Sequence, residues 1–204
     1  MKHTVVLFLT LFLSATVHAQ NIELPAPHKT GGLPLMEALA KRCTSREFDP
    51  RELSPQQLSD LTWAACGFNR SNGKRTAPSS RNKQEVELYL LMKSGAYVYD
   101  AAKHALRQIS TEDLRQFGAK TAAALCVVYV GDLSKLNGPV EERKATSAVN
   151  TGFIGQNIYL YCASEGLVTG YHSGGIDRAA LAPKLNLHAQ QAILAAQPVS
   201  YPKP

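Results

Sequence analysis

The sequence has few cysteines and histidines, and their spacing does not suit a metal site. Its four cysteines include no Cys-x-x-Cys pair, and no two of its six histidines have the spacing of metal ligands on a helix or strand. This argues against a zinc site and against a dense disulfide framework. Cys126 lies in an apolar strand pattern and Cys162 in a helical one, so we expect both to be buried free thiols.

Motifs that mark several large enzyme classes are also missing. The chain has no Gly-x-Gly-x-x-Gly, no phosphate-binding loop with its lysine, no Gly-x-Ser-x-Gly and no His-Glu-x-x-His. The net charge of +6 comes from scattered basic residues, which does not indicate a nucleic-acid surface. With 204 residues, of which 45% are hydrophobic, the composition predicts a single globular domain.

The main apolar run lies near the N-terminus and is too short to cross a membrane. It covers residues 5–13, after the basic start at Lys2 and before a small-residue exit at Ala19, whereas a spanning helix needs about 20 residues. This pattern predicts a secretory signal peptide over residues 1–19, although an uncleaved anchor would begin in the same way. Cleavage would leave a secreted or periplasmic protein with no stable membrane insertion.

The rest of the chain predicts a lead over residues 20–33 and one domain over residues 34–204. Helices are expected over residues 34–42, 55–66, 110–117, 150–165 and 177–181. Strands are expected over residues 86–92, 95–100, 104–109, 122–130, 168–171 and 192–199. Interleaved strands and helices predict an α+β sandwich around one mixed sheet.

Two of these helices have informative details. Ser54-Pro55-Gln56-Gln57 has the pattern of a capping box with proline at the first helical position. The helix over residues 150–165 is apolar nearly all round, so it must be buried in a core or an interface. Gly152 and Gly155 would let another backbone or a flat ligand approach it closely.

The segment Arg42-Cys43-Thr44-Ser45-Arg46 has the residue types of an anion site. If the turn stays helical, Arg42 and Arg46 share one face with the hydroxyl of Thr44 between them, and two converging guanidiniums suit a phosphate. A solvated basic helix end would have the same composition.

Three further segments could contact a flat or anionic ligand. The stretch from Pro78 to Gln84 holds hydroxyls and amides that suit the edge of a heterocycle, as well as an ordinary loop. The stretch from Tyr171 to Asp177 passes through two glycines into a helix start, where backbone amides are exposed unless it forms a plain turn. Lys203 adds one cation close to the C-terminus.

Taken together and in this order, these segments resemble the nitroreductase family of FMN flavoproteins. The resemblance extends over about residues 35–203 and is strongest to the branch whose dehydrogenases oxidise thiazoline and oxazoline rings in peptide precursors. Its motifs are Arg42-x-Thr44-x-Arg46, Pro78-Ser79-Ser80-x-Asn82-x-Gln84, Gly155-Gln156-Asn157, Glu165-Gly166-Leu167 and Tyr201-Pro202-Lys203.

The resemblance implies a three-layer sandwich with a mixed or antiparallel central sheet flanked by helices. It also implies a homodimer with FMN at the subunit interface. Arg42, Arg46 and Lys203 would hold the phosphate, and Thr44 would contact the ribityl chain. Pro78, Ser79, Ser80 and Asn82 would reach the flavin ring from the partner subunit. Ser173, Gly174 and Gly175 would line its other side.

Two positions depart from the family pattern. The family often has a second basic residue just after the terminal lysine, where this chain has Pro204, and Glu85 stands where a proline is common. These differences concern the tightness of FMN binding rather than the fold.

The resemblance implies an FMN-dependent oxidoreductase that transfers hydride in a ping-pong cycle on a small or flat organic substrate. The alternative is a non-catalytic exported protein of the same fold that holds a flavin or another flat ligand. In the first case the hydride chemistry belongs to the cofactor, and no acid or base residue is assigned. Export would also separate the protein from cytosolic NAD(P)H.

Overall fold

One antiparallel sheet organises the chain in the computed structural model, which describes residues 20–120 and 123–204. The predicted signal peptide therefore lies outside the described residues. Seven strands follow the order β1-β4-β3-β2-β5-β7-β6, and all of their pairings are antiparallel. The strands are β1 (Ile22–Glu23), β2 (Val86–Met92), β3 (Gly95–Asp100), β4 (Ala105–Ser110), β5 (Leu125–Asp132), β6 (Val168–Thr169) and β7 (Gln191–Ser200).

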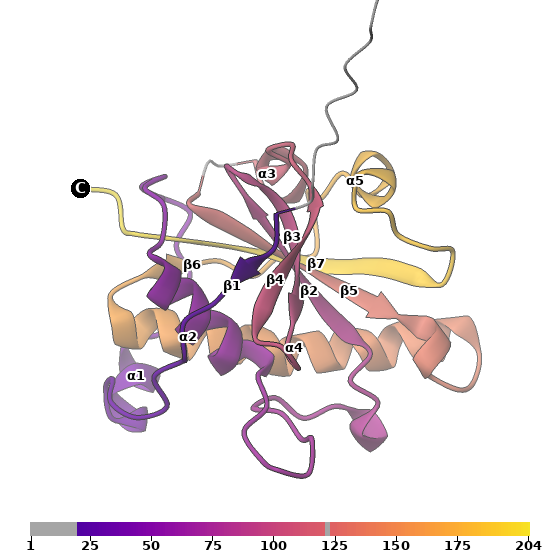
Figure 1. Cartoon of the computed structure of the whole chain (residues 1–204), viewed down its shortest axis with the longest axis horizontal. Coiled ribbons are helices and arrows are strands. Elements are labelled where there is room, and N and C mark those ends of the chain that lie inside the picture. The colour runs from indigo at the N-terminus through magenta and orange to yellow at the C-terminus, as the bar shows by residue number, and fades with distance from the viewer. Residues whose placement is uncertain (1–19, 121–122) are drawn as a thin grey trace, which may run out of the picture.

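Helices cover both faces of this sheet and make three layers (Figure 1). The helices are α1 (Leu35–Lys41), α2 (Pro55–Cys66), α3 (Arg115–Gly118), α4 (Val140–Glu165) and α5 (Arg178–Lys184), with the 3-10 turns η1 (Ser80–Asn82) and η2 (Leu133–Lys135). Helices α1, α2 and α4 lie on one side, and α3 and α5 lie on the other. This confirms the predicted α+β sandwich, with the antiparallel rather than the mixed arrangement of the sheet.

The central strands are buried on both faces, so their sequences are mostly continuous apolar runs and do not alternate between apolar and polar residues. In β2, Leu88 and Leu90 pack in the core beneath α2 and α4. Their neighbours Tyr89 and Leu91 pack in the second core beneath α3 and α5. The buried thiols of Cys126 and Cys162 belong one to each core and form no disulfide, as predicted.

Helix α2 begins as its sequence indicates. The Ser54 hydroxyl accepts the Gln57 amide at 3.1 Å, and the Gln57 side chain accepts the Ser54 amide at 2.9 Å. These two bonds form the predicted capping box, and the helix ends before Gly67. Among the described helices, none is both long and apolar enough to span a bilayer.

Several predicted boundaries were wrong. Helix α4 starts at Val140, ten residues before the predicted start, because the polar residues after Pro139 continue the helix into solvent. Helix α3 covers only the end of the predicted range 110–117. In α1, Leu35 and Leu39 are exposed and Ala38 alone is buried, so the predicted apolar face does not pack within this chain.

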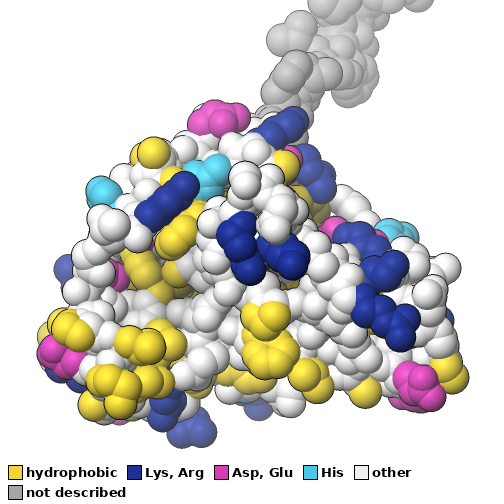
Figure 2. Space-filling view, turned by 90° about the horizontal axis from the view of Figure 1, so that it is seen from below, with side chains coloured by type: hydrophobic (Ala, Val, Ile, Leu, Met, Phe, Trp, Pro, Cys, Tyr) yellow, Lys and Arg dark blue, Asp and Glu magenta, His cyan; other side chains and the backbone are white. Residues whose placement is uncertain are grey.

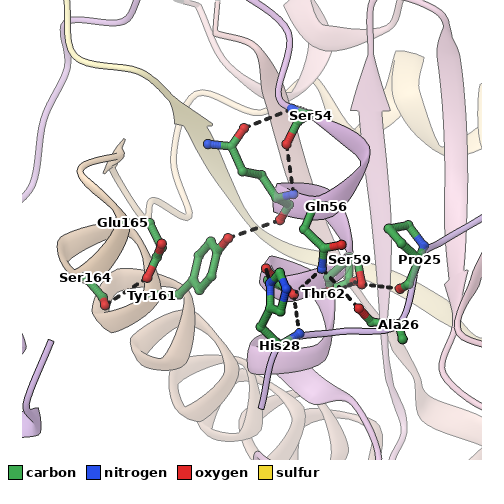
Figure 3. Close-up of polar contacts among 12 residues, drawn as sticks. Pro25, Ala26, His28, Ser54, Gln56, Ser59, Thr62, Tyr161, Ser164 and Glu165 are labelled. Atoms are coloured by element: carbon green, nitrogen blue, oxygen red, sulfur yellow. Dashed lines mark hydrogen bonds and ion pairs between the residues drawn. The ribbon is translucent and has the colours of Figure 1, made fainter. Parts of the chain in front are cut away.

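The lead is tied to α2 by polar contacts (Figure 3). The His28 amide and ring meet the Asp60 carboxylate at 2.7 and 3.0 Å, and Gln56 donates to the Ala26 carbonyl at 3.1 Å. Ser59 donates to the Pro25 carbonyl at 2.6 Å. The lead therefore belongs to the folded domain, although strand β1 within it was not predicted.

The imidazole of His104 continues this network into the sheet. Because the Ser59 proton goes to Pro25, the His104 Nε2–H donates to Ser59 at 2.7 Å and Nδ1 accepts the Tyr99 hydroxyl at 2.9 Å. Burial lowers the pKa of His104 from its ordinary 6.5. The neutral ring is therefore the form that fits this site.

We predict that the free energy of unfolding falls as the pH is lowered from 7 to 5. Below pH 6.5 the unfolded chain takes up a proton on His104 before the folded chain does, so protonation favours unfolding. His104→Asn, which tolerates the residue's positive φ of 49°, should be less stable at pH 7 and show a shallower loss. Urea titrations at each pH measure this, and equal slopes for both proteins would contradict it.

Candidate functional site

The segment of residues 42–46 begins where α1 ends. Arg42 closes the helix with ψ at 119°, and the chain then has no regular secondary structure up to the β-bridge at Asp49. The idea that Arg42 and Arg46 share a helix face is therefore wrong. Arg42 instead lies over the ring of Tyr159 in α4, with the guanidinium carbon 5.2 Å from the ring centroid.

Strand β6 fixes the middle of this segment. The Ser45 amide donates to the Thr169 carbonyl at 2.9 Å. A methyl group added at Gly170 would lie 2.7 Å from the Ser45 carbonyl oxygen, so the two backbones approach more closely than any other residue would allow. This contact brings Thr44 and Arg46 beside the stretch that follows β6.

That stretch is the glycine loop, residues 171–177, between β6 and α5. His172 bridges to Ala196 of β7 through two backbone hydrogen bonds of 2.9 Å. Arg178 donates to the Ser173 carbonyl at 2.7 Å. Gly174 and Gly175 have no neighbour within 4 Å of an added Cβ among the described residues, and Gly175 has φ at 73°. The loop is anchored at both ends and open in the middle.

A cavity of about 210 Å³ lies between the 42–46 segment and the glycine loop. Four of the predicted site residues line it, namely Thr44, Arg46, Gly174 and Gly175. Phe48, Ala119 and Pro198 add apolar walls, and Lys120 and His172 add polar groups that the sequence analysis did not select. The cavity therefore has the Arg46 guanidinium and the Thr44 hydroxyl on one side and the backbone of Gly174 and Gly175 on the other.

The remaining predicted residues lie elsewhere in the chain. Pro78, Ser79, Ser80 and Asn82 do not line this cavity; Pro78 and Ser79 border a smaller hollow beside Asn150. Lys203 is exposed, two residues after Tyr201, whose carbonyl accepts the Asp49 amide at 3.0 Å. The tail thus pairs with the chain just beyond Arg46, while the role of Lys203 stays a prediction.

The segment from Pro78 to Gln84, which we call the arm, is a tightly bonded loop. Gln84 makes two of the hydrogen bonds that hold this loop. Its amide donates to the Ser79 hydroxyl at 2.9 Å, and its side chain donates to the Gly73 carbonyl at 2.8 Å. Arg81, Asn82 and Gln84 all have positive φ, near 50°. Such backbone is costly for residues other than glycine and marks a shape that the rest of the fold imposes.

A larger cavity of about 520 Å³ lies between α2, α4 and the lead. His28, Asp60, Trp63 and Glu165 are among its lining residues, and none of the predicted flavin contacts is. Its basic side chains already have partners, because His28 contacts Asp60 and Lys29 lies 5.8 Å from the Trp63 ring centroid. We therefore place the candidate site in the smaller cavity, where Arg46 and the open backbone meet.

Comparison with known proteins agrees with this architecture. The model of the nitroreductase family matches residues 39–201. The chain belongs to the nitroreductase family. Members of this family are oxidoreductases that typically depend on a flavin.

Three solved structures show how far the likeness extends. A nitroreductase-family protein from Ralstonia eutropha JMP134 is 34% identical, with a TM-score of 0.83 over 90% of each chain. A chain of the E. coli microcin synthetase McbBCD complex has a TM-score of 0.70 at 18% identity, covering 98% of this chain and 85% of that one. An FMN-dependent nitroreductase from Clostridium difficile R20291 has a TM-score of 0.57 at 14% identity, covering 83% and 88%. The last two share the fold.

We predict that Gly170→Ala destabilises the protein by about 1–3 kcal/mol, because its Cβ must displace the Ser45 backbone. Gly174→Ala is the matched control: its Cβ meets open space, so the change in unfolding free energy should stay within about 0.5 kcal/mol. Urea unfolding of flavin-free protein measures both. Equal stability of the two variants would show that the close approach at Ser45 is not a constraint.

Proposed function

We propose that this nitroreductase-family protein is an FMN-dependent oxidoreductase acting on a small or flat organic substrate. The observation that carries the proposal is the cavity where Thr44 and Arg46 meet the open backbone of Gly174 and Gly175. When bound, FMN would supply the hydride chemistry, taking hydride from a donor and giving it to an acceptor in a ping-pong cycle. The FMN dependence of the C. difficile relative supports the same cofactor.

The phosphate end of FMN fits the 42–46 segment. Within the described chain, neither Arg42 nor Arg46 has a carboxylate within 4.0 Å. A guanidinium that is not paired with a carboxylate can bind phosphate through two parallel hydrogen bonds, and the hydroxyl of Thr44 adds a neutral donor. Lys203 on the neighbouring tail would add a further cation.

The ring end fits the glycine loop. The His172 ring meets the Gly174 carbonyl at 2.7 Å, but the amides of Gly174 and Gly175 donate no hydrogen bond within the described chain, so they can donate to a flat ligand. Phe48 and Pro198 would exclude water from one side of the ring. Donors fixed in this way stabilise charge that develops on the ring without first having to reorganise.

We further propose that the site is completed by a second copy of the chain. A cavity of about 210 Å³ is smaller than the roughly 300–1,000 Å³ of most small-molecule sites. The arm, which would supply Pro78, Ser79, Ser80 and Asn82, lies outside it. In a homodimer, the arm of one subunit would meet the cavity of the other.

Exposed apolar side chains mark a surface for that second copy. Leu35, Met36 and Leu39 of α1 and Val149 and Phe153 of α4 are exposed, and Gly152 beside them has open space around it. Figure 2 shows hydrophobic side chains gathered in groups on the face that α1 and α4 share. Clustered exposed apolar groups of this kind are typical of protein interfaces.

Export remains part of the proposal, on the pattern of residues 1–19. Protein recovered from the periplasm of an expressing bacterium should begin at Gln20 and, after incubation with FMN, show oxidised-flavin absorption that a reductant bleaches and an electron acceptor restores. A flavin that binds but is not reduced would instead favour the non-catalytic binding protein. Protein that takes up no FMN would refute the FMN-dependent enzyme and leave only a binder of another flat ligand.

We predict that the double variant Arg42→Ala/Arg46→Ala binds FMN about 100-fold or more weakly, because two charged hydrogen-bonding groups are lost. Fluorescence titration with FMN measures the dissociation constant. Lys103→Ala/Arg107→Ala removes two exposed cations from the β3–β4 hairpin and should leave binding unchanged. Retention of wild-type affinity by the arginine variant would contradict the phosphate assignment.

We predict that Phe153→Asp converts a dimer to a monomer and weakens FMN binding at the same time, since each site needs the partner's arm. Val140→Asp is the control, because Val140 and Phe153 are equally exposed, at 45%, on the same helix. Sedimentation velocity gives the mass and fluorescence gives the affinity. A monomeric wild-type protein that binds FMN tightly would overturn the shared site.

A further inference from the structure

Tyr159 lies on α4 and is not among the residues that the sequence analysis selected as flavin contacts. Its hydroxyl is 2.9 Å from the Thr44 hydroxyl and 2.9 Å from the Tyr171 amide nitrogen. The Arg42 guanidinium lies over the ring of Tyr159, with the guanidinium carbon 5.2 Å from the ring centroid. One side chain therefore contacts both ends of the 42–44 stretch and the first residue of the glycine loop.

The hydroxyl of Tyr159 links Thr44 to the glycine loop. The Tyr171 amide can only donate, so the Tyr159 oxygen accepts from it. Between the two hydroxyls, either oxygen can be the donor. Thr44 makes no other hydrogen bond through its hydroxyl among the described residues, and it lines the cavity of the candidate site. When Tyr159 donates to Thr44, the Thr44 proton is available for an anionic or hydroxyl oxygen of a ligand.

The ring of Tyr159 acts on the neighbouring arginine. A guanidinium stacked on an aromatic face loses rotational freedom and keeps its hydrogen-bonding edge available. Arg42 thus has a favoured position over the Tyr159 ring in the absence of any ligand. Ordering these groups before binding removes an entropic cost that the ligand would otherwise have to offset.

We propose that Tyr159 is the positioning residue of the cofactor site. It holds the Arg42 guanidinium and the Thr44 hydroxyl on one side, and it fixes the start of the glycine loop on the other. This inference rests on the proposed FMN site and assigns to Tyr159 a role in how tightly that site binds. Tyr159 is not proposed to contact the reacting atoms.

Two variants separate the ring from the hydroxyl. Tyr159→Phe keeps the ring over which Arg42 lies but removes the hydrogen-bond partner of the Tyr171 amide and of the Thr44 hydroxyl. Tyr159→Leu removes both functions. Tyr161→Phe is the matched control, because it deletes another tyrosine hydroxyl from α4. That hydroxyl donates to the Gln57 carbonyl of α2 at 3.4 Å (Figure 3), and Tyr161 does not line the cavity of the candidate site.

We expect Tyr159→Phe to weaken FMN binding about 10-fold, Tyr159→Leu to weaken it further, and Tyr161→Phe to change it less than about 2-fold. Fluorescence titration with FMN gives the three dissociation constants. A double-mutant cycle with Thr44→Val gives the mechanism: because the Tyr159 hydroxyl acts partly through Thr44, its removal should matter less when the threonine hydroxyl is already absent. A general loss of stability would instead give independent effects.

A second measurement needs no ligand. In flavin-free Tyr159→Phe, amide hydrogen exchange over residues 168–175 should be faster than in the wild type, whereas Tyr161→Phe should leave it unchanged. Wild-type FMN affinity in Tyr159→Phe, or fully independent effects in the cycle, would overturn the role of Tyr159 while leaving the proposed function intact. Failure of the wild-type protein to bind FMN would overturn both, and unchanged exchange would refute the link to the glycine loop by itself.

Discussion

The close packing of α4 against β5 and β7 is the interaction on which the rest of the structure depends. The helix face that meets the sheet combines small residues with Ile154 and Ile158, and Ser147 and Thr151 are fully buried there. At Gly155 an added Cβ would lie 2.9 Å from the Tyr171 ring. Gln197 of β7 donates to the Gly155 carbonyl at 3.3 Å and accepts the Tyr129 hydroxyl. A larger residue at Gly155 would push α4 away from the sheet and would also displace Tyr171, the first residue of the glycine loop.

This packing gives α4 three roles along its length. Its inner face closes the core, the ring and hydroxyl of Tyr159 hold both walls of the candidate site, and its outer face carries the exposed Val149 and Phe153. A rigid helix that links these features transmits any shift of one to the others. The proposed dimer surface and the proposed cofactor site are therefore set by one element. The close approach of Tyr171 explains why this helix contains a glycine at position 155 despite the cost of glycine to helix stability.

The sequence was most informative where structure is local. The capping box at Ser54 and the strands expected over residues 95–100 and 104–109 depend on neighbouring residues, and they occur as predicted to within one residue. The start of α4 was missed because its first turns are polar and gain nothing from core packing that a hydrophobic pattern could reveal. The exposure of α1 was missed for the opposite reason, since an apolar stripe does not say whether it packs within the chain or against another copy.

The candidate site was only partly predictable, because its contacts join distant segments. Motif resemblance selected Thr44, Arg46, Gly174 and Gly175, but not Tyr159, which is recognisable only once α4 lies beside them. Glu85 makes the same point for the arm. Its carboxylate is fully buried and accepts the Asn150 amide of α4 at 2.7 Å, while its backbone carbonyl accepts the Asp132 amide at 2.9 Å. A residue that departs from the family pattern thus ties the arm to the helix that holds Tyr159. In the proposed dimer, the group offered to the partner's ligand and the group that orders the chain's own site would be fixed to one helix.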